Sequence, residues 1–242
     1  MKKHWILSTV ILVMSCLMLT ASAQETNPDK KLKIGFGIGF NFSGPQQQMG
    51  MLMKKYGYDD TQKNWFKIFN SKDYITYPIY SEAGFTAHIS GLYPIAANSH
   101  VGLMLYYSAF GEVIGYSNTY GRIDVSLKNV SVIPLYTYEL KDCLEIQAGP
   151  ALMINSGNNV SPGEHTAYEK YTRQSLGLFT GLNLKIWNRA GTFGKIGANY
   201  LLTTDSEMGP YTSETFNSLN RVPETKLNFS HGNFTFVFGL KL

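Results

Sequence analysis

The sequence of 242 residues has little charge, little cysteine and, after its first two dozen residues, no long apolar run. Charged residues make up 16% of the chain, whereas a soluble domain usually carries about 25%. Few charges are expected where much of the surface faces hydrocarbon instead of water. The net charge of +4 is mild, and the basic residues do not cluster on one face. Nucleic acid is therefore not expected as a partner.

The scarcity of cysteine and of apolar runs excludes two further classes of protein. Cys143 is the only cysteine after the first two dozen residues, so a scaffold built on intrachain disulfides is excluded. No apolar run in that part of the chain reaches the roughly 20 residues that a transmembrane helix needs. A bundle of membrane helices is therefore excluded as well.

The first residues have the composition of an export signal. Lys2 and Lys3 precede an apolar stretch from Trp5 to about Thr20, and residues 21–23, Ala-Ser-Ala, form a suitable cleavage site. We therefore expect a signal peptide at residues 1–23 and a single domain at residues 24–242. Lipoprotein processing at Cys16 is the weaker alternative.

The remaining chain alternates between apolar and small or polar residues with the period of a β-strand. Residues 34–42 place Ile or Phe at every even position and mostly Gly at the odd ones, and residues 233–242 repeat the pattern. Weaker alternation marks six further segments, at residues 79–92, 101–108, 123–139, 144–154, 176–186 and 196–202. The phase is unclear near Asn129, where a β-bulge is expected.

The connections between these segments alternate in length. Long ones cover residues 44–77, 155–174 and 205–225, a medium one covers residues 115–121, and tight turns fall near residues 93–98, 141–142 and 188–191. Long loops outside and short turns in the periplasm are typical of outer-membrane barrels. The sequence therefore predicts an all-β fold, a closed antiparallel up-and-down transmembrane β-barrel of about eight strands, in the outer membrane.

A soluble barrel is the main alternative to this interpretation. In a soluble barrel, charged residues would stand opposite the large apolar ones in order to meet water. The positions opposite Ile34, Phe36 and Ile38 are glycines instead. The pattern therefore favours an apolar face toward lipid and a small or polar face toward the lumen.

Two short motifs resemble a known family. Residues 132–138 read Val-Ile-Pro-Leu-Tyr-Thr-Tyr, and residues 144–150 read Leu-Glu-Ile-Gln-Ala-Gly-Pro. An "IPL" strand followed by a "GP" strand resembles the PorT-like and OmpA-like small outer-membrane β-barrel domains. The resemblance implies a barrel in the outer membrane, and it implies no particular activity, because members of the family are functionally diverse.

The alternation also predicts which polar residues point into the lumen. By parity these residues are Lys33, Glu82, His88, Glu145, Lys185, Lys195 and Lys241. The interior of an eight-stranded barrel is only wide enough for side chains, and charges buried there must be paired or hydrated. We expect Glu145 to bridge Lys185, directly or through water, and the filled lumen to make a poor pore.

The sequence gives weak support for a catalytic or nucleotide-binding site. Glu82 and His88 lie six residues apart on one strand, about 20 Å, so they cannot form a catalytic pair. The glycines of residues 35–39 lie within a strand, whereas a nucleotide loop would lead into a helix. No enzymatic activity, cofactor or metal is therefore expected.

The first long connection is unusually apolar. Residues 46–56 are expected to form a short amphipathic helix with Met49, Leu52, Met53 and Tyr56 on one face, and Trp65 and Phe66 follow. Such a segment either packs on the barrel rim or serves as a lid or a docking surface for a partner.

Three functions remain open at this point. The favoured one is a non-enzymatic barrel, with outer-membrane lipid around it, whose long extracellular loops bind partners or support envelope integrity. The second is an accessory barrel of a secretion or envelope-assembly machine, in contact with its proteins. The third is a lipid-modifying enzyme, which would require an inward-facing His with Ser and acidic neighbours.

Overall fold

The computed structural model describes residues 31–42, 44–58, 79–81, 84–117, 119–141, 143–160, 167–189, 191–212 and 222–242. The expected signal peptide at residues 1–23 lies outside these ranges. Among the described residues, no helix combines the length and the apolar character needed to cross a membrane.

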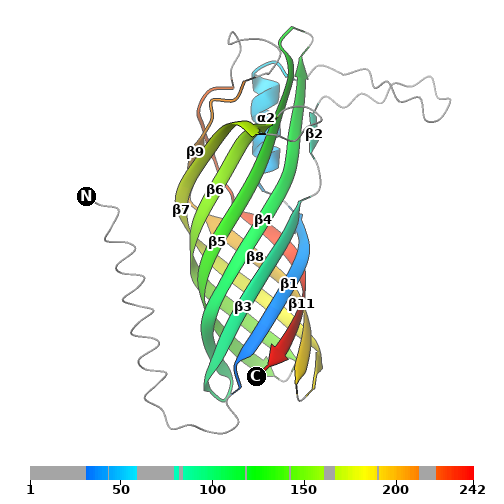
Figure 1. Cartoon of the computed structure of the whole chain (residues 1–242), viewed down its shortest axis with the longest axis vertical. Coiled ribbons are helices and arrows are strands. Elements are labelled where there is room, and N and C mark those ends of the chain that lie inside the picture. The colour runs from blue at the N-terminus through cyan, green and yellow to red at the C-terminus, as the bar shows by residue number, and fades with distance from the viewer. Residues whose placement is uncertain are drawn as a thin grey trace, which may run out of the picture.

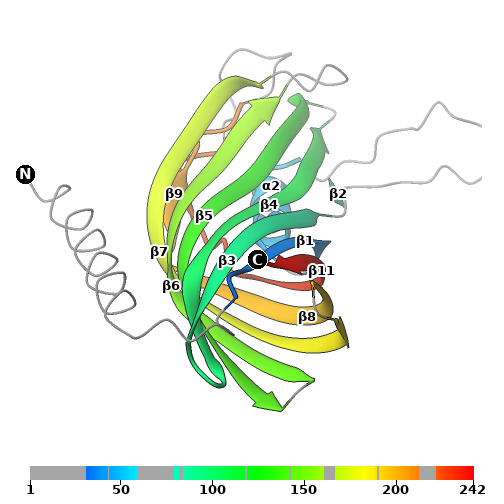
Figure 2. The same cartoon turned by 60° about the horizontal axis from the view of Figure 1, so that its bottom comes forward.

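Eight long strands form a closed ring in chain order (Figures 1 and 2). They are β1 (Lys33–Phe42), β3 (Phe85–Ala96), β4 (Ser99–Ser117), β5 (Gly121–Lys141), β6 (Leu144–Val160), β7 (Ala167–Asn188), β8 (Thr192–Thr203) and β11 (His231–Lys241). Every neighbouring pair is antiparallel, and β1 completes the ring by pairing with β11 from Lys33↔Lys241 to Phe42↔Gly232. The predicted up-and-down barrel of about eight strands is confirmed.

The tight turns after β3, β5 and β7 lie at the same end of the barrel as the start of β1 and the end of β11, and we call this the turn end. The opposite end, the loop end, carries the helix α2 (Pro45–Lys55) and the short strands β2 (Ile79–Ser81), β9 (Ser206–Met208) and β10 (Thr225–Leu227) (Figure 1). β2 pairs with β4, and β9 pairs with β10. The predicted strand at residues 79–92 is therefore two strands, β2 and β3.

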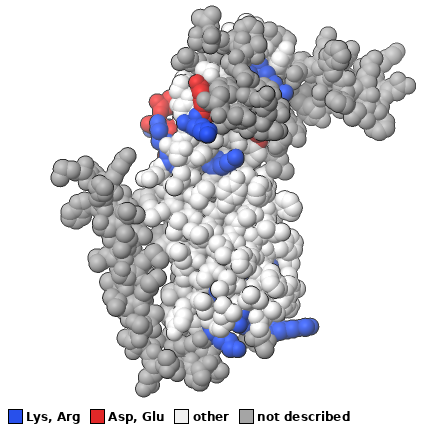
Figure 3. Space-filling view, viewed as in Figure 1, with Lys and Arg blue, Asp and Glu red and all other residues white. Residues whose placement is uncertain are grey.

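The outer face of the wall is apolar. In β1, Ile38 and Phe40 are each 69% exposed, whereas Gly37 and Gly39 between them are buried. Figure 3 shows a broad belt without Lys, Arg, Asp or Glu between two charged ends. Exposed Tyr93, Tyr138 and Trp187 lie close to the tight turns, as in the aromatic girdle of a membrane barrel, whereas Phe193 is buried in the lumen.

One side of the barrel rises above the other at the loop end. The strands β4 to β7 have 17 to 22 residues each, whereas β1, β3, β8 and β11 have 10 to 12. The predicted long loop at residues 155–174 is wrong, because β6 continues to Val160 and β7 begins at Ala167. This hairpin extends past the apolar belt, where a strand no longer needs a lipid-facing apolar side and so loses its alternation.

The irregularity expected near Asn129 lies on the neighbouring strand. Pairing of β5 with β6 runs through Asn129 without a shift, whereas pairing of β4 with β5 shifts between Ala109 and Glu112. Gly111 in this stretch has φ +76°, a conformation that favours glycine. The bulge therefore belongs to β4.

Candidate functional site

The lumen gathers nearly all of the buried polar residues, so it is the candidate site. Its turn end holds two glutamates that face each other, since Glu139 on β5 pairs with Glu145 on β6. Two lysines face each other in the same way, Lys185 on β7 and Lys195 on β8. Like charges directly opposite each other repel. The glutamate pair and the lysine pair therefore stabilise each other by lying side by side.

These four residues and Lys33 form a chain of alternating charge, which we call the charged ladder. Lys33 Nζ donates to Glu139 Oε1 at 2.7 Å, and Lys185 Nζ donates to Glu139 Oε2 at 2.6 Å. Lys185 Nζ also lies 3.7 Å from Glu145 Oε1, and Lys195 Nζ donates to Glu145 Oε2 at 2.5 Å. Because β1 lies three strands away from β5 in the ring, the Lys33 contact spans the lumen.

The structure brings together four of the seven residues predicted to line the lumen, namely Lys33, Glu145, Lys185 and Lys195. Lys241 lies at the rim, where its Nζ donates to the Arg189 carbonyl at 3.0 Å. His88 lies deeper in the lumen, and Glu82 is outside the described residues. Sequence reasoning missed Glu139, because a register shift between Glu139 and Lys141 brings it opposite Glu145.

Above the ladder, the middle of the lumen combines polar and aromatic groups. The His88 ring stacks on Tyr106 with centroids 6.0 Å apart and lies over Gly37, where a Cβ would come within 2.1 Å of the imidazole. Next to His88 is a small cavity that has room for about one water molecule. Its polar lining comes from His88, Ser90, Gln147, Asn183, Lys195 and Asn199.

A serine and a histidine meet farther toward the loop end. Ser108 Oγ lies 2.9 Å from His231 Nε2, and His231 Nδ1 lies 2.8 Å from the Phe229 carbonyl oxygen. The carbonyl can only accept, so Nδ1 carries the proton and Nε2 accepts from the serine hydroxyl. This pair resembles a nucleophile with its base, but a backbone carbonyl takes the place of the acid.

The surroundings of this pair leave no room for a substrate. Ser108 and His231 are both fully buried, and the Phe110 ring packs edge-on against the imidazole at 4.8 Å. Asn233 and Tyr106 fill the remaining side, where Asn233 Nδ2 donates to Tyr106 OH at 2.5 Å. The pair is therefore part of the packed interior.

An apolar layer, which we call the mid-lumen cluster, fills the centre of the barrel. It consists of Leu92, Met104, Tyr106, Ile133, Leu135, Ala151, Met153, Phe179 and Leu201, each at most 2% exposed. A hydrogen-bonded polar group lies beside it, in which Asn155 Nδ2 donates to Ser175 and Ser206 at 2.7 Å, and Asn155 Oδ1 accepts from Asn129 Nδ2 at 2.5 Å. Together these layers close the section between the charged ladder and the loop end.

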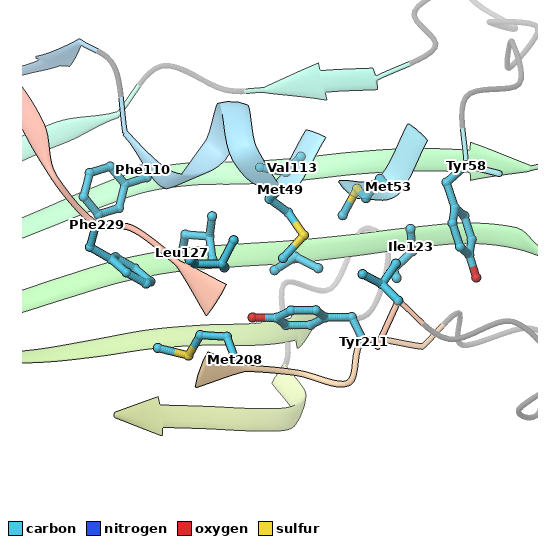
Figure 4. Close-up of a cluster of buried hydrophobic side chains, with 13 residues drawn as sticks. Met49, Met53, Tyr58, Phe110, Val113, Ile123, Leu127, Met208, Tyr211 and Phe229 are labelled. Atoms are coloured by element: carbon cyan, nitrogen blue, oxygen red, sulfur yellow. The ribbon is translucent and has the colours of Figure 1, made fainter. Parts of the chain in front are cut away.

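The loop end is closed by a second apolar core, the loop-end plug (Figure 4). Its buried members are Met49, Met53, Tyr58, Phe110, Val113, Ile123, Val125, Leu127, Met208, Tyr211, Val222, Leu227 and Phe229. Met49 and Met53 extend from α2 toward the inner face of β4 and β5. The segment around β9 and β10 covers them from the other side (Figure 4). Asn228 N donates to Gln48 Oε1 at 2.9 Å and so joins α2 to the second segment.

Tyr211 fixes the last loop against the tall wall. Its hydroxyl lies over Gly157 on β6, where a Cβ would approach it to 2.2 Å, and its ring meets Tyr171 edge-on at 5.4 Å. Burial raises the pKa of the Tyr211 phenol above its ordinary value. The described parts of the first and last long connections, α2 and the segment around β9 and β10, are thus folded into the mouth of the barrel.

The helix expected in the first long connection is present as α2. Its Met49 and Met53 are fully buried in the plug, and Leu52 and Tyr56 pack partly buried against it. Trp65 and Phe66, which were predicted to follow the helix in a possible partner-binding loop, lie outside the described residues. Among the described residues no cluster of His, Cys, Asp or Glu is suited to hold a metal ion.

Comparison with known proteins agrees with this architecture. The family model of the outer membrane protein β-barrel domain matches residues 22–236. No curated protein sequence matches the chain.

Similar solved structures include three bacterial outer-membrane proteins. OprG from Pseudomonas aeruginosa is 13% identical with a TM-score of 0.49, covering 88% of this chain and 96% of its own. Neisserial surface protein A is 12% identical with a TM-score of 0.42, covering 88% and 97%, and the Escherichia coli outer membrane protease OmpT is 12% identical with a TM-score of 0.34, covering 91% and 99%. Since the family model spans most of the sequence, the chain belongs to the outer membrane protein β-barrel domain family and resides in the outer membrane.

Proposed function

We propose that this protein is a non-enzymatic barrel of the outer membrane that is closed to passage along its axis. Its folded loop end then faces the cell exterior and serves partner binding or envelope integrity. The observation that carries the proposal is the double closure of the lumen. The charged ladder fills the turn end, the loop-end plug fills the mouth, and the cavity between them has room for one water molecule.

Electrical measurement on planar bilayers tests the closure. We expect purified protein to give no steady conductance under conditions in which a general porin conducts. Swelling of proteoliposomes in sugar solutions gives an independent readout, and no swelling is expected. A large steady conductance from correctly folded protein would overturn the proposal.

The Ser108–His231 pair is the specific observation in favour of an enzyme, so it needs its own test. We expect Ser108→Ala to restore the envelope resistance of a deletion strain to detergents as fully as the wild-type chain does. Ser175→Ala is the matched control, because Ser175 is also buried and hydrogen-bonded, by Asn155. Failure of the Ser108 variant alone, at equal folded amounts, would favour a lipid-modifying enzyme.

The accessory-barrel hypothesis rests on the PorT-like motifs at residues 132–138 and 144–150. It predicts that a stoichiometric secretion complex accompanies the barrel during mild purification from native membranes. We favour the isolated barrel, because a single chain supplies the closed ring of strands, the charged ladder and the loop-end plug. Recovery of such a complex at constant stoichiometry would reverse this preference.

A further inference from the structure

The wall of the barrel has an interruption between β5 and β6. Pairing of these strands extends from Val125↔Asn159 to Val132↔Leu152 and resumes with the same register at Tyr136↔Ala148. This register places Pro134 opposite Pro150 in the missing stretch. The pairing irregularities of the other seams lie near an end of the barrel or of a strand, between Pro94 and Ala96, Ala109 and Glu112, Asn159 and Val160, and Lys185 and Trp187.

The two prolines explain the interruption. A proline has no backbone N–H, so it cannot donate to the ladder. Pro134 keeps its pairing with Leu103 on β4, and Pro150 keeps its pairing with Leu178 on β7. Both missing donors therefore belong to the same seam, which we call the proline seam. In hydrocarbon each unpaired backbone group costs several kcal/mol, so this seam is the weakest part of the wall.

The inner side of the proline seam is apolar. Ile133, Leu135 and Ala151 are at most 2% exposed and belong to the mid-lumen cluster. The fourth inward position is Gly149, which has no side chain, and a Cβ there would come within 1.9 Å of the Pro134 carbonyl oxygen. The two backbones therefore stay in close contact at this point although the hydrogen bonds are missing, and apolar side chains back them from the lumen.

The apolar layer continues from the seam to the cavity. Leu92, Met104 and Phe179 belong to the mid-lumen cluster and also line the cavity next to His88. Two of the cluster members, Met104 and Met153, have unbranched side chains that repack easily around an inserted group. Apolar side chains therefore extend without a break from the inner side of the seam to the centre of the barrel.

We propose that the proline seam is a lateral portal through which an acyl chain of a membrane lipid enters the mid-lumen cluster. The acyl chain is the occupant that the surroundings supply, because the outer face of the seam carries apolar side chains such as Tyr136 and Ile154, about half exposed to the bilayer. The missing stretch of three residues is about 10 Å long, which suits one chain. The portal is independent of axial closure, since neither the charged ladder nor the loop-end plug takes part in it.

The methionines of this protein are natural reporters for the test. The full chain, reconstituted in lipid nanodiscs, carries ¹³C-methyl methionine, and the probe is a phospholipid with a nitroxide at the end of one acyl chain. We expect the Met104 and Met153 methyl signals to broaden strongly, and those of Met49 and Met208 in the loop-end plug to broaden little. A nitroxide that stays outside the barrel also broadens signals across the wall. The comparison between variants therefore decides whether the acyl chain enters.

Pro134→Val combined with Pro150→Val restores two N–H donors and closes the seam. We expect loss of the excess broadening at Met104 and Met153, together with slow hydrogen exchange of the two new amides. Tyr136→Cys with Ala148→Cys, in a Cys143→Ser background, closes the same seam with a disulfide. Cross-strand partners have the Cα separation that a disulfide needs.

Leu182→Cys with Ala198→Cys is the matched control, because it links exposed partners across the intact β7–β8 seam. We expect the Met104 and Met153 methyl signals of this control to broaden as much as those of the wild-type chain. Equal broadening in the wild-type chain and both closed-seam variants would overturn the portal. The closed-seam variants should still lack conductance, so a failure of the portal and a failure of the proposed axial closure give different results.

Discussion

At the scale of single residues, Glu139 is the member of the charged ladder that holds two lysines. It accepts from Lys33 and Lys185, and its side chain is 16% exposed. We expect Glu139→Ala to lower the free energy of unfolding by about 3 kcal/mol, because both lysines lose a partner inside the lumen. Urea unfolding in lipid vesicles measures the change.

The control for this prediction is an ion pair at the surface. Arg173 and Glu224 lie 3.5 Å apart with side chains about half exposed. Water screens such a pair, so Glu224→Ala is expected to cost at most about 1 kcal/mol. Equal losses in the two variants would mean that the ladder is as hydrated as the surface.

Two neighbouring glycines allow a second test at this scale. A Cβ on Gly102 would come within 1.8 Å of the Gly91 carbonyl oxygen, whereas a Cβ on Gly91 would meet nothing within 4 Å. We expect Gly102→Ala to destabilise the barrel by about 1–3 kcal/mol, since the β3 and β4 backbones must separate. Gly91→Ala should change stability by no more than about 0.5 kcal/mol in the same unfolding assay.

At the scale of elements, α2 stabilises the mouth of the barrel through one face only. Met53 is fully buried in the loop-end plug, whereas Met51 on the opposite face is 66% exposed. We expect Met53→Ala to cost about 2–5 kcal/mol of local stability and to expose the helix to proteases, while Met51→Ala has little effect. Limited proteolysis of reconstituted protein follows the difference, and equal cleavage of both variants would show that α2 is not anchored by this face.

The elements within the membrane were predictable, because lipid on one side and a narrow lumen on the other force strict alternation. The seam between β1 and β11 follows from the apolar pattern of residues 34–42 and 234–242. Above the apolar belt this constraint ends, so the continuation of β6 to Val160 and the start of β7 at Ala167 left no pattern in the sequence.

The candidate site was predictable in part for the same reason. Parity alone placed Lys33, Glu145, Lys185 and Lys195 inside the lumen, where the structure joins them in the ladder. The Ser108–His231 contact and the loop-end plug depend on segments far apart in the sequence and on how the loops fold back. Such contacts have no period, so the sequence alone does not indicate them.

At the scale of the whole molecule, the apolar belt determines where the barrel sits in the bilayer. Phe236 is 54% exposed in the middle of β11, and Tyr138 is 40% exposed near a tight turn. We expect Phe236→Lys to destabilise the inserted barrel by about 2–4 kcal/mol and Tyr138→Lys by about 1 kcal/mol or less, because the cost of a charge depends on depth. Reversible folding into vesicles measures both, and equal costs would contradict the predicted depth of the belt.

The pairing of β1 with β11 also has a consequence for biogenesis. Until β11 is in place, β1 and β8 each keep an open hydrogen-bonding edge, which hydrocarbon does not tolerate. A chain that ends within β11 leaves part of both edges open, so it is expected to fail to insert as a closed barrel, whereas a truncation before β1 leaves every strand pair intact.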